Sequence, residues 1–445
     1  MLEFPIHHRA RATLAGLVLA AWTLLPSARA VPAEGATTQQ VERLLAQLST
    51  APEAGDSMLA RQLAMLGSAA VPGLFDRLVL GANARLADPT TPRDARSRRE
   101  LDVILGALAG LPRTDVRAEV ALRLAAGANP GVRAAAMLAT AAEGRARELD
   151  HMLSIANPAL DADGFVAPFD ACVADACSAL ARRDDTTWPT AAALALRLDT
   201  APQLALLRAA GEDASEPALD VLGGALRTLP GRRLEVLAIL ARTLQDPTVT
   251  APRSVREAVV ELLRDPDPMA CAQAAIVAGR LEAATAVPQL VELVDSDSQG
   301  VRENAAWALS RITGLGMRTD GARWRAWLAD EHAWFDARHE RAREELRDRD
   351  AGVVRRAVLE LGRHRLDREQ LVLEIAPVLL HGDVETASVA AATIGALRSR
   401  SALACLRDVR DRVDPKVREA VDAAIASVEE PRTRARRTGL TRPGP

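Results

Sequence analysis

The chain has 445 residues, and its 59 acidic side chains slightly outnumber its 56 Lys and Arg side chains, for a formal net charge of −3. An acidic balance argues against nucleic acid as the main partner, because phosphate binding needs a basic surface. The sequence also lacks a glycine-rich phosphate loop, a nucleophile elbow and an H-E-x-x-H metal motif. We therefore expect a protein that is not an enzyme and holds no cofactor.

The N-terminus has the pattern of a secretory signal peptide. Basic and His residues at 7–11 precede the apolar run 12–25, and the small residues Ala28 and Ala30 form an A-x-A cleavage site. The apolar run is short for a membrane span, although an uncleaved anchor is the alternative. We expect residues 1–30 to be removed, 31–37 to be a linker, and the mature protein to reside in the periplasm or outside the cell. No later run is long and uncharged enough to cross a bilayer.

A short motif recurs between Thr38 and Val428: a turn acid or Asn, then Val-Arg or its equivalent, then an Ala-rich run. It starts at Asn129, Asp297, Asp350 and Asp414. The period is roughly 32 residues, which accommodates two helices and two turns. Apolar side chains fall at helical spacing within a unit, as at Val301, Ala305, Ala308, Leu309 and Ile312. No sustained alternation indicates a strand, so the fold class is all-α. Before the first clear unit, residues 84–98 are expected to form a polar loop.

These units resemble HEAT repeats, in particular the short bacterial kind related to the HEAT-like repeats of phycobilisome lyases. The resemblance implies a right-handed α-solenoid of stacked antiparallel helix pairs, a HEAT/armadillo-like superhelix, over residues 38–428. In that family the turn acid and the helix Arg form a ladder between successive repeats. The resemblance therefore implies structural, inter-repeat roles for Asp297, Arg302, Asp350, Arg355, Asp414 and Arg418. Ser388 stands where the Asp383 unit would carry its Arg, so the ladder is expected to break there.

Two features lie in the middle of the chain. The segment from Asp161 to Asp170 resembles part of a calcium loop, but its first ligand position falls on Ala159 and its last is Asp rather than Glu. A plain interhelical loop is the alternative. Cys172 and Cys177 are expected on one helix, where residues five apart lie beyond disulfide reach. A disulfide between them would require the helix to begin after Cys172.

The long interval between Asp297 and Asp350 contains an insertion of about 20 residues, 319–338, that is rich in tryptophan. Trp324, Trp327 and Trp334 share a helical face with Leu328 and Glu331. Two interpretations remain open. The tryptophans attach an extra helical hairpin to the stack, or, with Phe335, they form an exposed interaction patch.

Ligand-type residues also occur in and after this insertion. His332, Asp336 and His339 lie too far apart along a helix to bind one ion together. His332 with Asp336 would supply at most half a site, and an ordinary solvated helix face is the alternative. We therefore expect no metal site here.

The C-terminal tail, residues 429–445, carries five Arg with Gly and Pro and is expected to be disordered. Three functions compete. The first is an exported non-enzymatic scaffold that binds a protein or peptide on the concave face of the solenoid. The second is a structural envelope component whose tail contacts anionic polymers. The third, suggested only by the resemblance, is a lyase-type enzyme acting on a tetrapyrrole.

Overall fold

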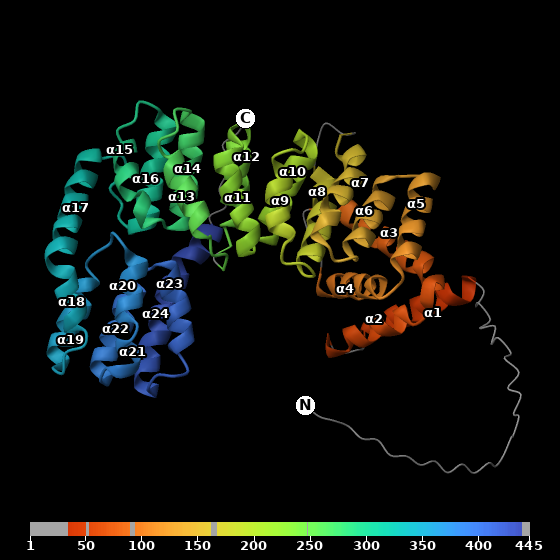
Figure 1. The fold of residues 1–445 in the computed structure, drawn as a ribbon. Helices are drawn as coiled ribbons and strands as arrows, with labels where there is room; N and C mark the ends of the chain where they lie inside the picture. Colours follow the sequence, from red (N-terminus) through yellow and green to blue (C-terminus); the bar gives the residue numbers. More distant parts are fainter. Residues whose placement is uncertain (1–33, 50–52, 90–93, 162–166, 247, 438–445) are drawn as a thin grey trace, which may run out of the picture.

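The computed structural model describes residues 34–49, 53–89, 94–161, 167–246 and 248–437. Every regular element in these ranges is a helix, which confirms the all-α prediction. The helices form an arch with α1 at one end and α19–α24 at the other (Figure 1). The predicted cleavage site at Ala28 and Ala30 lies outside the described residues.

The first helices form an irregular end to the arch. They are α1 (Glu34–Ala46), α2 (Asp56–Ala64), α3 (Val71–Ala87), α4 (Ala95–Ala109) and α5 (Arg113–Ala126). α2 packs on α4, and α3 lies across α6 and α8. The predictions of a linker over 31–37 and a loop over 84–98 both included residues that are helical. α1 begins at Glu34, and the Asp94 carboxylate accepts a hydrogen bond from Ser97 N at 2.7 Å and so starts α4.

The rest of the stack up to residue 334 consists of two rows of helices, in which successive members of each row are generally neighbours. The first row contains α6 (Pro130–Ala141), α8 (Ala167–Ala181), α10 (Thr200–Asp213), α12 (Arg233–Thr243), α14 (Pro268–Leu281) and α16 (Gln299–Thr313). The second row contains α7 (Leu149–Asp161), α9 (Thr187–Ala195), α11 (Glu216–Thr228), α13 (Arg253–Leu262), α15 (Val287–Leu293) and α17 (Gly321–Trp334). The helix-pair repeat predicted from the sequence is therefore confirmed.

The same arrangement continues in a C-terminal block. Its helices are α18 (Glu340–Glu345), α19 (Ala351–Leu361), α20 (Arg368–Ile375), α21 (Val378–His381), α22 (Val384–Leu397), α23 (Arg400–Val409) and α24 (Pro415–Arg437). α24 extends as a helix to Arg437, so the prediction of a disordered tail from 429 is wrong for its first half. Residues 438–445 lie outside the described part, and contact of the tail with an anionic polymer stays a prediction.

Small residues set the close spacing of neighbouring helices. A Cβ atom added to Gly279 of α14 would lie 2.9 Å from Ala308 Cα of α16. In the C-terminal block, a Cβ at Gly395 of α22 would lie 2.9 Å from Ala424 Cβ of α24. Both contacts are closer than van der Waals spacing allows, so glycine is what permits these pairs of helices to approach. The predicted apolar stripe from Val301 to Ile312 is buried against this row.

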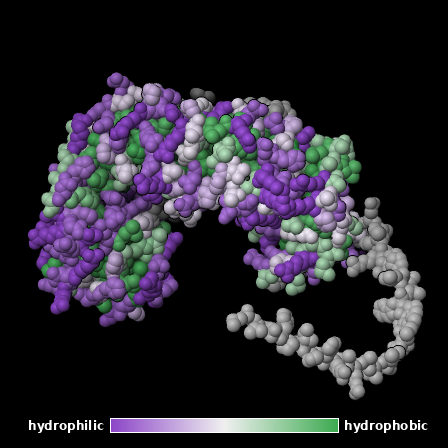
Figure 2. Space-filling model, viewed as in Figure 1, coloured by the Kyte–Doolittle hydropathy of each residue, from purple (hydrophilic) through white to green (hydrophobic). Residues whose placement is uncertain are grey.

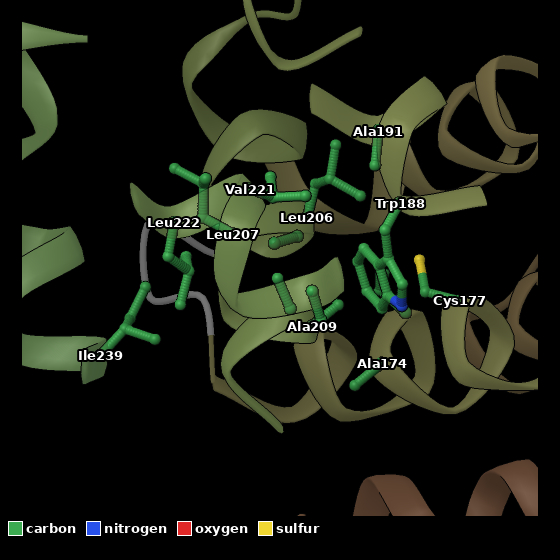
Figure 3. Packing of buried hydrophobic residues seen from close by; sticks show 14 of the residues in the cluster. Ala174, Cys177, Trp188, Ala191, Leu206, Leu207, Ala209, Val221, Leu222 and Ile239 are labelled. Carbon is green, nitrogen blue, oxygen red and sulfur yellow. The ribbon is translucent and has the colours of Figure 1, made fainter. Parts of the chain in front are cut away.

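The buried apolar side chains divide into two main cores. One runs from Val41 to Trp324, and the other runs from Ala342 to Ala424. Figure 3 shows a section of the first core, where Leu206 and Leu207 of α10 pack toward α8, α9 and α11. The two cores are joined along the chain by one continuous helical segment: α17, a π-helix over Phe335–His339, and α18.

The two cysteines of the middle segment share one helix, as predicted. Cys172 and Cys177 both lie in α8, which begins at Ala167; both are buried, and neither forms a disulfide. The Cys177 sulfur lies beside the Trp188 ring (Figure 3). The alternative, a disulfide made by a helix that starts after Cys172, is therefore wrong. The suggested calcium loop falls largely on residues 162–166, outside the described part.

No single helix in the described ranges is long and apolar enough to cross a membrane. The segments Glu53–Ala64 and Gly67–Ala87 reach the threshold only as a pair, and a bend of 112° separates them.

Candidate interaction surfaces

The tryptophans of the insertion are mostly packed inside the molecule. Trp324 has no exposed surface, and its indole N–H donates to Arg318 O at 2.8 Å. Trp327 is half-buried and meets Trp324 edge to face, with ring centroids 5.6 Å apart. Trp324 thus completes the first core, as expected for a structural role.

Trp334 and Phe335 attach the insertion to the C-terminal block. The Trp334 ring stacks on His364 with centroids 3.5 Å apart, and its N–H donates to Glu360 Oε1 at 3.1 Å. Phe335 meets Trp334 edge to face at 5.0 Å. Both side chains are half-buried. The interpretation of an exposed patch formed by Trp324, Trp327, Trp334 and Phe335 is therefore wrong. What attaches to the stack is one long helix rather than a hairpin.

A buried carboxylate fixes α17 to the loop between α19 and α20. Glu331 is 6% exposed, and its Oε2 accepts hydrogen bonds from Arg365 N at 2.9 Å and Leu366 N at 3.0 Å. Its Oε1 lies 3.2 Å from His364 Nδ1. The sequence placed Glu331 on the tryptophan face but gave no sign that backbone N–H groups would meet it. Its position on an otherwise aromatic face is the signal that could have been used.

The suggested metal ligands separate in the structure. His332 and Asp336 are exposed, whereas His339 Nε2 lies 2.9 Å from Glu374 Oε2 on α20. Within the described ranges, no cluster of three or more His, Cys, Asp or Glu side chains is arranged to hold a metal ion.

A buried arginine that the sequence analysis missed connects the two cores. Arg368, at the start of α20, is 6% exposed. It donates to Ile312 O at 2.6 Å and Arg311 O at 2.7 Å, at the end of α16. It also donates to Leu397 O at 2.8 Å, at the end of α22. One guanidinium thus satisfies the last carbonyls of a helix in each core. Burial lowers its pKa, but these acceptors are the groups that a guanidinium requires.

The predicted inter-repeat ladder takes a different form. Arg302 donates to the carbonyls of Ser296 and Asp297 in the turn before its own helix, and Arg418 donates to Arg410 O at 3.1 Å. These contacts lie inside single turns because a long side chain one turn into a helix reaches back over the preceding loop.

The turn acids act mainly as helix caps. The carboxylates of Asp350 and Asp414 accept from Gly352 N at 2.7 Å and Lys416 N at 2.8 Å. Only Arg355 of the predicted arginines forms an ion pair with the next repeat, and its partner is Glu385. Charged contacts between repeats do occur elsewhere, as between Arg233 and Asp265 at 2.8 Å. The ladder is thus corrected to caps and turn bonds at Asp350, Asp414, Arg302 and Arg418.

A second group of charges, of which Arg85 and Asp170 are buried, lies where α3 crosses the first row. Arg85 lies 3.5 Å from Asp175 on α8 and 3.7 Å from Glu212 on α10. Burial raises the pKa of Asp170 in spite of its ion pair with Arg208, and burial also raises the pKa of Glu212. These partners come from consecutive first-row helices, so the network holds α3 against the stack.

The largest of three notable cavities lies in the C-terminal block and measures about 810 Å³. It lies between α18, the following turn, the start of α19, α20, α21 and the start of α22. Cavities of 350 and 230 Å³ lie beside α5 and between α3 and α4. Large exposed apolar side chains, such as Trp307 at 44%, are otherwise scattered singly, which is ordinary for a protein surface.

Comparison with known proteins gives one family. A family model for HEAT repeats matches residues 256–333, from α13 through most of α17. No curated protein matches the chain.

Several solved structures resemble it loosely. Human deoxyhypusine hydroxylase in complex with glycerol is 16% identical, with 55% of this chain and 97% of that chain covered and a TM-score of 0.25. The karyopherin Kap121p bound to the SUMO protease Ulp1p is 11% identical. The match covers 88% of this chain and 45% of the karyopherin, with a TM-score of 0.34. Kap121p crystallised alone is 11% identical, with 89% and 52% covered and a TM-score of 0.29.

The chain spans about half the length of these karyopherins. Likenesses this loose transfer neither an activity nor a partner. The specific relation to phycobilisome lyases stays a prediction. The stacked helix pairs and the matched repeats agree: residues 256–333 contain HEAT repeats, and the described helices form an all-α solenoid.

Proposed function

We propose that this protein is an exported, non-enzymatic scaffold that binds a protein or peptide partner on the hollow face, the inner side of the arch. The observation that carries this proposal is the shape. The stack curves so that the α1–α4 end and the C-terminal block flank a hollow (Figure 2). Stacked repeats create extended surfaces of this kind, and such surfaces suit elongated partners.

The chemistry of the thiols argues against a role of three cysteines as nucleophiles. Burial raises the pKa of Cys177 to about 12, and it also raises the pKa values of Cys271 and Cys405. Thiols of this kind stay protonated near neutral pH and are poor nucleophiles.

Photo-crosslinking along the arch tests the proposal. A photoreactive amino acid would be placed at exposed sites along the stack, for example at Leu122 on α5, at Leu196 just after α9 and at Leu234 on α12. We expect one partner to be crosslinked in source cells from a contiguous subset of sites. Equal labelling from all sites, or none above a non-irradiated control, would contradict a defined binding face.

Export is proposed from the residues before Val31. The basic start, the short apolar run and the Ala-x-Ala site support it. N-terminal sequencing of the protein recovered from source cells should begin at Val31. Recovery of intact residues 1–30 on a cytoplasmic protein would exclude this part of the proposal.

A further inference from the structure

The 810 Å³ cavity in the C-terminal block has two walls of different character. One wall is apolar, and it contains Leu346, Val354, Leu373, Pro377 and Val378. Leu373 is 60% exposed although it lies beside buried neighbours on α20. The other wall is basic and consists of Arg343, Arg347 and Arg349, from α18 and the turn that follows it. A volume of this size is in the usual range for a ligand site.

The carboxylates that line the same cavity already have partners. Glu374 is bonded to His339 at 2.9 Å and to Gln370 at 2.9 Å. Asp348 accepts from Asp350 N at 2.8 Å, and Asp383 accepts from Thr386 N at 2.8 Å. These bonds hold the three carboxylates to other groups of the fold, and within the described residues none of them forms an ion pair with Arg347 or Arg349.

Two of the arginines are available. Arg343 is paired with Glu340. Arg347 and Arg349 are exposed, and in the described part of the chain neither side chain makes a hydrogen bond or an ion pair. The turn that carries them is itself fixed, because Arg347 N donates to Glu344 O at 3.0 Å and Asp350 caps α19. A guanidinium presented on a fixed turn loses little freedom when it binds a carboxylate.

We propose that this cavity binds an acidic peptide segment, with an apolar side chain against Leu373 and Pro377 and carboxylates on Arg347 and Arg349. The proposal rests on the proposed function only in assuming that the chain binds peptides. Charge complementarity selects the occupant. The chain's own C-terminal residues, 438–445, contain Arg442 and no acid, so they do not match the basic wall.

Fluorescence polarisation with two labelled hexapeptides tests the site on the full chain. One peptide alternates Leu with Glu, and the other alternates Leu with Lys. We expect the Glu peptide to bind at least about tenfold more tightly. This affinity should fall with rising salt because exposed charges are screened. Equal affinity, a preference for the Lys peptide, or no binding of either peptide would each overturn the proposal.

Matched variants locate the binding. The double substitution R347A/R349A should weaken binding of the Glu peptide about tenfold or more, since it removes two charged donors. The control R356A/R363A removes the same charge from exposed positions that do not line the cavity. It should change the affinity less than about twofold. Equal losses in both double variants would show a general charge effect and exclude the site.

A second pair of variants tests the apolar wall. Leu373→Ser should weaken binding severalfold, whereas Leu359→Ser, at a position 49% exposed on α19 and outside the cavity, should not. All four residues of the first pair and both leucines are exposed, so thermal melts should be unchanged and confirm folding.

Two further measurements separate possible failures. Competition by a short single-stranded oligonucleotide that depends on Arg347 and Arg349 would assign the cavity to phosphates and overturn the peptide assignment. If the crosslinked partner is retained while neither hexapeptide binds, the cavity proposal fails and the scaffold stands. Loss of both would end the proposed function as well.

Discussion

In the stack that ends with α16, neighbouring helices meet through glycine and alanine, whereas the joint between α16 and α19 is held by charged and aromatic groups. At Gly279 and Ala308 the backbones themselves come close. Across the joint the connections are the Arg368 guanidinium, the Glu331 carboxylate and the Trp334–His364 stack. Apolar contact between small residues tolerates sliding, but hydrogen bonds to fixed carbonyls define one geometry. The joint therefore sets the angle of the arch.

The largest effect should come from Arg368→Met. This change keeps an apolar stem but leaves the carbonyls of Arg311, Ile312 and Leu397 without their buried donor. Leaving a buried carbonyl without its donor costs about 1–3 kcal/mol for each group. Urea unfolding should separate into two transitions as the C-terminal block uncouples. The exposed Arg363→Ala serves as the control. A single, unshifted transition in Arg368→Met would show that the cores are coupled by other contacts.

Substituting the close-contact glycines should affect one core at a time. A Cβ at position 279 or 395 meets the neighbouring helix at 2.9 Å, so Gly279→Ala or Gly395→Ala should cost about 1–3 kcal/mol by overpacking. Hydrogen exchange should show the loss in α14 and α16 for the first and in α22 and α24 for the second. Gly224→Ala is the matched control, because nothing lies within 4 Å of its added Cβ. It should be neutral or slightly stabilising through helix propensity.

Lowering the pH should destabilise the joint but not the stack, because the pKa values of two carboxyl groups are shifted in opposite directions. At the joint, a hydrogen bond from Arg338 holds the pKa of Glu360 below its usual value. The stability that ionised Glu360 gives to the fold is therefore present above an unfolded pKa of about 4.3. It is lost as pH falls through the folded pKa. In the stack, burial raises the pKa of Asp170. The stability that protonated Asp170 gives to the fold is therefore fully present below an unfolded pKa of about 3.9. It is lost as pH rises through the folded pKa.

Hydrogen exchange between pH 6 and pH 3 measures this difference. α19 should lose protection before α8 does, and Glu360→Gln should reduce the pH dependence at α19. Asp170→Asn should reduce the pH dependence at α8 instead. Parallel loss of protection in both helices, unchanged by either variant, would mean that the carboxylates at these positions do not distinguish the regions.

The smallest loss of stability should come from substituting Arg302, a residue of the recurring motif. Arg302→Ala removes bonds to two carbonyls of a surface turn, so the free energy of unfolding should fall by less than about 1 kcal/mol. Neighbouring repeats should keep their protection in hydrogen exchange. A larger, spreading loss would restore the inter-repeat role that the family resemblance implied.

The contrast also explains what could be predicted. The helix pairs could be predicted from periodicity. In a segment such as Val301 to Ile312, an apolar residue recurs at every helical turn because that face is buried. The joint was not predictable in the same way. Arg368 follows an ordinary capping Asp in the sequence, and its acceptors lie 29 to 57 residues away along the chain. A hydrogen bond to a distant carbonyl leaves no periodic pattern. The cavity was missed for the same reason, since its walls come from five helices and the turns between them.

The π-helix over Phe335–His339 has a geometric consequence for the whole arch. A π-turn accommodates one residue more than an α-turn, and each residue of an α-helix advances the direction of its side chain by about 100°. Deleting a single residue there would return the segment to α-helix and re-aim the C-terminal block relative to the stack. The span of the arch would then change, and the contacts of Trp334 and Phe335 with the C-terminal block would have to form again.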